Sequence, residues 1–135
     1  MKPFIRGLVI AAAVVASACS SAPKPTREDV EKSMRATWEH PASRATERTR
    51  IQFNQITFGK TYPANPQDVV DGVPPDSAVT AVLVDFTTRN HYPTRTYAVR
   101  RVREAKVYLD KFGQWAVMTG QARGQDEMKD EPAAP

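Results

Sequence analysis

The chain contains a single cysteine, Cys19, among its 135 residues. One thiol has no partner with which to form a disulfide inside the chain, so packing of apolar side chains must hold the fold together. The cysteine closes an uncharged stretch, residues 7–19, that follows Lys2 and Arg6. These 13 residues are too few for a transmembrane helix, which needs about 20.

Residues 1–18 have the organisation of a secretory signal peptide. Lys2 and Arg6 give a positive start, residues 7–16 are uncharged, and two small residues precede the expected cleavage point. Removal of this segment leaves 117 residues and lowers the formal net charge from +4 to +2, because both lost charges are positive. Export also argues against the nucleic-acid partner that a basic chain would otherwise indicate.

The segment Ala16-Ser17-Ala18-Cys19 resembles the lipobox of bacterial lipoproteins, with Ala16 where Leu is commonest. The resemblance implies that the Cys19 thiol receives diacylglycerol, that the chain is cut before it, and that the new amine is acylated, for example with palmitate. Two or three acyl chains hold a protein durably on a membrane, whereas one holds it marginally. The alternative is an unmodified cysteine left after a cleaved signal peptide.

Ser20 follows the cysteine, and this resembles lipoproteins of the outer membrane, because aspartate at that place is the usual signal for inner-membrane retention. We therefore expect the protein in the cell envelope, anchored by lipid to the outer membrane and facing the periplasm. Residues 19–25 form a proline-containing tether. Residues 26–119 form one α+β domain. Residues 120–135 are acidic and poor in apolar side chains, so we expect a disordered tail.

A helix begins the expected domain. Thr26 and Asp29 match the T-x-x-D capping pattern, and Pro41 disfavours helical geometry at residue 40, so the helix should end near Glu39. Three large apolar residues stand four apart on one helical face: Val30, Met34 and Trp38. Such a single apolar stripe needs a sheet to cover it.

Four segments have the alternation of β-strands: 51–58, 79–88, 97–109 and 115–119. In the first, the apolar parity changes across Asn54-Gln55, which predicts a β-bulge there. Residues 110–114 include Gly113 and predict a hairpin between the last two strands. The order predicts an α+β fold with one N-terminal helix packed on a four-stranded antiparallel sheet.

This element order, together with the Lys-Phe-Gly-Gln-Trp hairpin at residues 111–115, resembles the cystatin-like and NTF2-like superfamily. The resemblance implies a curved sheet that wraps around the helix. That superfamily contains both enzymes and binding modules, so the resemblance does not decide the activity.

Residue types that carry catalysis are sparse. The two histidines, His40 and His91, have no cysteine, histidine or carboxylate at metal-ligand spacing, and no nucleophile or phosphate-loop motif occurs. We therefore predict no cofactor, no metal and no catalysis. Asp85 is interpreted as the acidic partner of Arg100, Arg101 or Arg103 on the next strand, with a general base as the alternative.

Residues 89–103 contain five arginines and an interleaved aromatic residue: Arg89, Arg95, Arg100, Arg101, Arg103 and Tyr97. These six are the candidate partner-binding residues. One interpretation is the solvated edge of a strand, since cations protect sheet edges from aggregation. The other is a cationic surface for an acidic protein, for lipid phosphates or for a glycan carboxylate.

The connection of residues 59–77 is long for a hairpin. Asn65-Pro66 predicts a helix cap followed by one helical turn, which should end at Gly72. Loops of this length often bind something. The alternative is a lid over the open end of the core, formed by three valines: Val69, Val70 and Val73.

The leading hypothesis is therefore a non-enzymatic, lipid-anchored periplasmic protein that binds or assembles with an envelope protein through the arginine strand and the 59–77 loop. The alternative is an NTF2-like ligand-binding protein or enzyme with a cavity between helix and sheet. Such a cavity would be lined by Trp38, Tyr97 and Trp115, with Asp85 or His91 directed inward. A third hypothesis is a structural lipoprotein that touches the cell wall.

Overall fold

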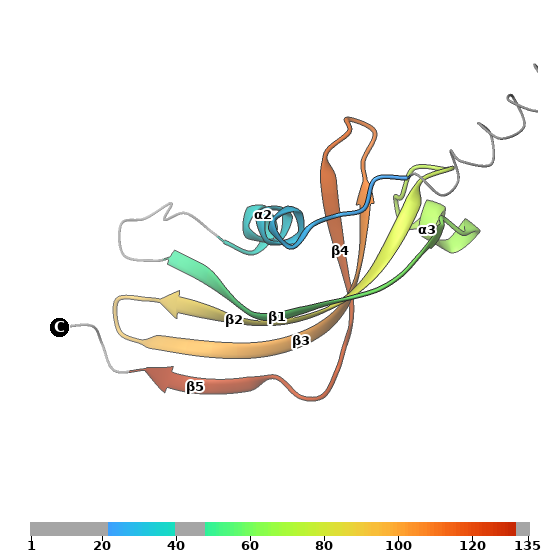
Figure 1. Ribbon diagram of the computed structural model, residues 1–135. Helices are drawn as coiled ribbons and strands as arrows, with labels where there is room; N and C mark the ends of the chain where they lie inside the picture. Colours follow the sequence, from blue (N-terminus) through green and yellow to red (C-terminus); the bar gives the residue numbers. More distant parts are fainter. Residues whose placement is uncertain (1–21, 40–47, 132–135) are drawn as a thin grey trace, which may run out of the picture.

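A computed structural model of the protein describes residues 22–39 and 48–131. Cys19, the expected signal peptide and His40 lie outside these residues. In chain order the elements are α2 (Arg27–Trp38), β1 (Arg48–Pro63), α3 (Pro66–Val70), β2 (Ala78–His91), β3 (Thr96–Leu109), β4 (Trp115–Ala122) and β5 (Glu127–Glu131). The helix α2 covers one face of the antiparallel sheet, which confirms the α+β class (Figure 1).

The sheet has the strand order β1-β2-β3-β4, and β5 pairs with β3 as well. One edge of β3 pairs with β2 along most of its length. The other edge is shared, because β4 occupies residues 103–109 of β3 and β5 occupies residues 96–100. Figure 1 shows β4 turning up beside α2 while β5 continues along β3.

The capping pattern of α2 forms as the sequence predicts. The Thr26 hydroxyl accepts a hydrogen bond from the Asp29 amide at 3.3 Å, and the Asp29 carboxylate accepts one from the Thr26 amide at 2.8 Å. Farther along, the Ser33 hydroxyl accepts from the Val117 amide of β4 at 3.1 Å. The Glu39 carboxylate accepts from the Ile51 amide of β1, also at 3.1 Å. The helix therefore joins the two outer strands of the curved sheet.

The core lies between α2 and the sheet. The side chains that are essentially inaccessible there include Val30, Met34, Val84, Phe86 and Val107. The Trp38 ring meets the Phe86 ring edge to face, with centroids 5.2 Å apart. Burial of such large apolar side chains, each worth about 1.5–3 kcal/mol, is the main stabilisation of a chain without a disulfide.

Several local predictions are confirmed. The register shifts between Phe53 and Gln55, which places the predicted bulge at Asn54. Gly113 has a φ of 76° in the turn between β3 and β4, a conformation that favours glycine. Helix α3 begins after its Asn65 cap.

The predicted connection of residues 59–77 is too long, because β1 continues to Pro63 and the connection is residues 64–77. It forms only part of the expected lid. Val73 is buried, whereas Val69 is 38% exposed and Val70 is 78% exposed. Two of the three valines are therefore available to solvent at this end of the molecule.

The prediction of a domain that ends at residue 119 and a disordered tail of residues 120–135 is wrong for residues 120–131. β4 extends to Ala122, and β5 forms a further strand. Apolar burial, on which the prediction relied, does not order this segment. Its backbone pairs with β3, and its acidic side chains meet arginines that are 23 to 42 residues away in the sequence. Residues 132–135 lie outside the described part of the chain.

None of the helices within the described part of the chain is both long and apolar enough to cross a membrane.

Candidate functional site

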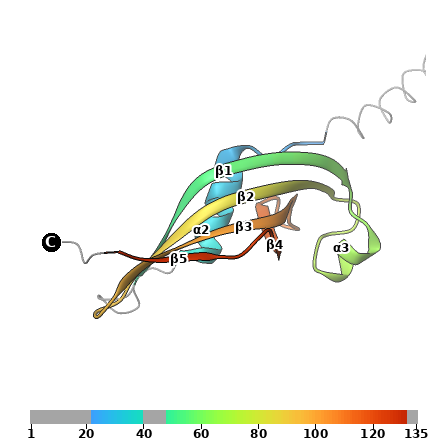
Figure 2. The ribbon, with the colours of Figure 1, turned by 90° about the horizontal axis from the view of Figure 1, so that it is seen from below.

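The chain enters the domain at one end of the sheet. Ala22 and Pro23 line a cavity together with Ala78, where β2 begins, and Leu109, where β3 ends. The turn between β2 and β3, residues 92–95, lies at the opposite end, away from α3 (Figure 2). We call this the distal end.

The five predicted arginines do not share one face of the sheet. Arg101 lies opposite Phe86 and Arg103 lies opposite Val84, so both are on the side covered by α2. Arg100 lies opposite Thr87 on the other side, which we call the open face, and Arg89 lies there too. Side-chain alternation along a strand explains the division, because neighbouring residues point to opposite faces.

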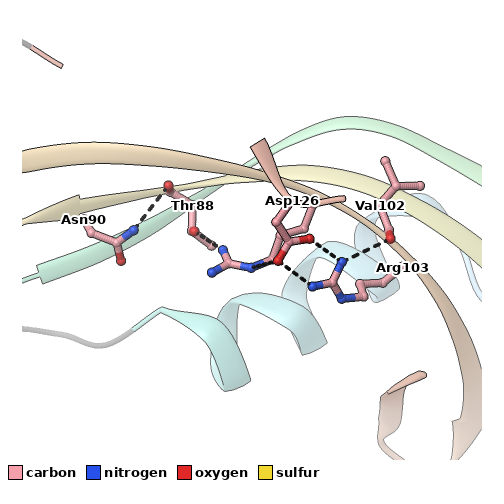
Figure 3. Close-up of polar contacts among 6 residues, drawn as sticks. Thr88, Asn90, Val102, Arg103 and Asp126 are labelled. Atoms are coloured by element: carbon pink, nitrogen blue, oxygen red, sulfur yellow. Dashed lines mark hydrogen bonds and ion pairs between the residues drawn. The ribbon is translucent and has the colours of Figure 1, made fainter. Parts of the chain in front are cut away.

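Asp126 holds the two arginines of the helix-covered face (Figure 3). Its carboxylate accepts two hydrogen bonds from Arg103, at 2.7 and 2.8 Å, and forms an ion pair with Arg101 at 3.5 Å. The hydrogen bonds from Arg103 lower the pKa of the Asp126 carboxyl below its ordinary value. Arg101 also lies over the Trp38 ring, 5.4 Å from its centroid, and donates to the Thr88 hydroxyl.

On the open face, Asp85 and Arg100 form the ion pair that the sequence predicted. The Arg100 guanidinium donates two hydrogen bonds to the carboxylate, at 3.0 and 2.6 Å. These bonds lower the pKa of Asp85 and raise that of Arg100. Asn54, the bulge residue, donates to the same carboxylate at 3.1 Å. Asp85 is therefore held as an ionised partner of Arg100, which is unlike the environment of a general base.

Strand β5 supplies acidic partners for three arginines near the distal end. Glu131 pairs with Arg89 at 3.2 Å, Asp130 pairs with Arg95 at 2.6 Å, and Glu127 approaches Arg100 at 4.0 Å. Tyr97, the remaining candidate residue, stacks on Tyr92 with ring centroids 5.9 Å apart, and Arg95 lies over its ring at 4.8 Å. The chain's own acidic residues thus meet all five predicted arginines.

Two arginines that the sequence analysis did not single out remain without an ion pair among the described residues. Arg48 and Arg50 are exposed on β1. They line a cavity of about 330 Å³ together with Arg89 and His91. The register explains this convergence, since Arg50 lies directly opposite Arg89 and Arg48 lies opposite His91. The sequence did not indicate that Arg48 and Arg50 lie on a strand, because the predicted first strand began only at Ile51.

A second, larger cavity of about 710 Å³ lies over the open face at the other end of the sheet. Ala81, Leu83 and Met118 contribute apolar lining. Gly59 also lines it, and a Cβ there would lie 3.2 Å from the Ala81 carbonyl oxygen, so a larger residue would require β1 or β2 to shift. We call this cavity the trough.

An ion pair connects helix α3 to the sheet beside the trough. Asp68 of α3 is fully buried, and its carboxylate pairs with Lys106 of β3. The hydrogen bond from Lys106 lowers the pKa of Asp68, and the same bond raises the pKa of Lys106. The other carboxylate oxygen of Asp68 accepts from the Asn65 amide at 3.0 Å, which completes the cap of α3.

The residues proposed for a cavity between helix and sheet are not brought together. Trp38 and Trp115 pack against the core, whereas Tyr97 lies at the opposite end of β3 from Leu109, the partner of Trp115. Within residues 22–39 and 48–131, no three histidine, cysteine or acidic residues are grouped so that they could hold a metal ion.

Comparison of the chain with protein-family models, with curated proteins and with solved structures gives no match. The resemblances to the lipobox and to the cystatin-like and NTF2-like superfamily therefore stay predictions from the sequence.

Proposed function

We propose that the protein is a lipid-anchored binding module of the bacterial envelope, and that its distal end binds an acidic segment of a partner protein. The binding surface consists of the open-face arginines of the distal half: Arg48, Arg50, Arg89 and Arg100. We call it the arginine surface.

The observation that carries the proposal is the convergence of Arg48, Arg50 and Arg89 on one cavity. Arg50 of β1 lies directly opposite Arg89 of the neighbouring strand β2. Like charges in directly opposed positions destabilise a sheet. Glu131 offsets the charge of Arg89, whereas Arg48 and Arg50 have no acidic partner among the described residues and remain available to an external anion. Guanidinium groups bind carboxylates through paired hydrogen bonds, so an acidic protein segment is a suitable ligand.

The position of the tether favours a protein partner over the headgroups of the anchoring membrane. Strand β2 runs from Ala78, beside the tether, to Arg89. An extended strand rises about 3.3 Å per residue, so these residues are roughly 35 Å apart along the strand. An anchor at Cys19 would therefore hold the arginine surface away from the bilayer and toward the periplasm.

The surface is tested with a photo-crosslinking residue placed at Thr94 in living cells. Thr94 is exposed at the distal end, and Val70, the exposed last residue of α3, is the matched control. We expect the photo-crosslinking residue at Thr94 to crosslink to an acidic peptide of one envelope protein. The same residue at Val70 should not crosslink to that protein. Arg50→Glu should abolish the capture, whereas Lys60→Glu, a charge reversal farther along β1, should leave it intact. Equal capture at Thr94 and Val70 would refute the distal site.

The anchor is tested separately with Cys19→Ser. Membrane fractionation should move the protein from the membrane to the soluble periplasmic fraction, because the hydroxyl cannot receive diacylglycerol by the lipoprotein route. Metabolic labelling with an alkyne fatty acid should label the chain that carries Cys19 and should not label Cys19→Ser. Unchanged membrane partitioning of Cys19→Ser would show that another segment attaches the protein.

A second candidate function is the binding of a small, largely apolar ligand in the trough. Its volume of about 710 Å³ falls in the range of ligand pockets, and charged Lys106 and Glu104 border its apolar lining. Leu83→Trp should fill the trough and abolish binding of an apolar fluorescent dye. Phe112→Trp, in the exposed turn between β3 and β4, is the control. Equal dye binding by both variants would exclude the trough.

A further inference from the structure

We infer that β5 is a replaceable strand, and that an acidic extended segment of the partner protein pairs with β3 in its place. This inference rests on the proposed function, because it states how an acidic segment reaches arginines that the chain already pairs with its own acids. The occupant would use backbone hydrogen bonds for affinity and carboxylates for specificity.

The first argument is that side-chain packing contributes little to holding β5. Residues 127–130 are all exposed, and Met128, the one large apolar residue of the strand, is 62% exposed. The ion pair of Arg95 with Asp130 joins side chains that are 49% and 70% exposed. Exposed ion pairs contribute little to stability, so the strand depends mainly on five residue pairs with β3.

The second argument is that β5 can leave without disturbing β4. Residues 123–126 connect the two strands, and Gly124 has a φ of 79° there. The connection is fixed at both ends, since the Arg123 amide donates to the Val102 carbonyl at 2.8 Å and Asp126 is held by Arg103. Residues 127–131 can therefore swing away from β3 while the core strands keep their partners.

The third argument is the chemistry of the site that β5 would vacate. Residues 96–100 of β3 would present an unpaired sheet edge, which is a template for another strand. Loss of Glu131 would also remove the acidic partner of Arg89, which lines the cavity with Arg48 and Arg50 and would keep only the neutral Gln52 side chain as a hydrogen-bond partner among the described residues. Replacement of β5 thus leaves Arg89, a member of the arginine surface, without its own acidic partner when an acidic strand arrives.

The same geometry defines the occupant. Its acidic residues should be spaced as in Glu127, Asp130 and Glu131, which meet Arg100, Arg95 and Arg89. The edge segment of β3 has five residues, so a short extended stretch of a partner is sufficient. A polybasic or uniformly apolar strand would supply no carboxylate to Arg95 and Arg89, whose acidic partners both come from β5.

The test uses a fluorescent peptide with the sequence of residues 127–135 and the full chain in a Cys19→Ser background. Ala98 and Lys129 are paired across β3 and β5, so Ala98→Cys with Lys129→Cys locks β5 when oxidised. In a second variant, Glu127→Lys, Asp130→Lys and Glu131→Lys together open the edge. Fluorescence anisotropy reports binding of the peptide to each form.

We expect the opened variant to bind the peptide at least about tenfold more tightly than the unmodified chain, because β5 no longer competes. The oxidised lock should not bind, and reduction should restore binding. A peptide with amides in place of the carboxylates should bind at least about tenfold more weakly. Should the opened variant not fold, the oxidised and reduced lock decide the question alone.

Equal binding by the oxidised and reduced lock would overturn the inference, since the peptide would then use another site such as the outer edge of β1. A dimer of the unmodified chain that disappears on locking would also overturn it, because β5 would then be exchanged between copies. If the oxidised lock still captures the partner at Thr94 in cells, strand replacement is wrong although the proposed function stands. If the peptide binds but Thr94 captures nothing, the proposed function fails, and with it the assignment of the occupant to a partner protein, while the exchange of β5 for another acidic strand stands.

Discussion

Strands β4 and β5 occupy the same edge of β3 and are stabilised in different ways. β4 carries Trp115 and Val117, which pack against the core beneath α2. β5 carries four exposed residues among its five, and beyond its backbone pairing with β3 its side chains contact the sheet mainly through ion pairs. Both strands thus pair with β3 through backbone hydrogen bonds, but β4 belongs to a packed region and β5 belongs to a charged region.

The comparison shows that backbone pairing alone does not make a strand permanent. Hydrogen bonds to a neighbouring strand exchange for hydrogen bonds to water, so their net contribution is only about 0.5–1.5 kcal/mol each. Burial of apolar side chains makes the difference in local stability. Regions of low local stability are those from which binding elements are usually drawn. The charged half of the sheet is therefore the place to look for function in this molecule.

The largest effect is expected from Phe86→Ala in the packed region. Phe86 is fully buried and meets the Trp38 ring, so its loss removes apolar burial and leaves a cavity. We expect the free energy of unfolding to fall by about 3–5 kcal/mol, as measured by chemical denaturation.

Phe112→Ala is the matched control, because Phe112 is 76% exposed in the turn between β3 and β4. It should change the free energy of unfolding by less than about 0.5 kcal/mol. Equal effects of the two substitutions would mean that the region beneath α2 is not the main source of stability.

The same contrast explains which parts of the molecule the sequence predicts. The cap of α2, the bulge at Asn54 and the Gly113 hairpin follow from patterns within a few neighbouring residues, and the structure confirms them. An ion pair of Asp85 with an arginine of the next strand was predicted because the two strands are adjacent, and the structure identifies that arginine as Arg100 among the three candidates.

The charged region was predicted less well because its order is non-local. β5 lacks an apolar alternation, and Glu131 depends on Arg89, 42 residues earlier. Arg50 gains its significance only from the register that places it opposite Arg89. No strand pattern within residues 120–131 indicates that Glu131 pairs with Arg89 or that Arg50 lies opposite Arg89.

A smaller effect is expected from Asp126→Asn, which acts at the boundary of the two regions. The carboxylate is bound by Arg103 and Arg101, and the amide would keep the shape without the charge. We expect the backbone amides of β5 to exchange with deuterium about tenfold faster, with little change in those of α2. Hydrogen-exchange mass spectrometry measures both in one experiment.

Low pH should have the same effect on β5 as Asp126→Asn. Hydrogen bonds from Arg103 lower the pKa of Asp126 in the folded protein below its unfolded value of about 3.9. A lowered pKa contributes stability that is present above the unfolded value and is lost as the pH falls through the folded value. β5 should therefore loosen as the pH falls below about 4, and Asp126→Asn should show a smaller response. An identical acid response of variant and unmodified chain would assign it to other carboxylates, such as Asp85.

The smallest effect, and the most selective one, is expected from salt. Raising the ionic strength from 0.1 to 1 M shortens the screening length from about 10 to about 3 Å. The exposed pairs of Arg95 with Asp130 and Arg89 with Glu131 should weaken, so that β5 amides exchange about threefold faster. The amides of β4 beside Trp115 and Val117 should not respond, because burial of apolar surface is not screened. A uniform acceleration over β4 and β5 would show that both strands open in one cooperative step, and strand replacement would then require the core to open as well.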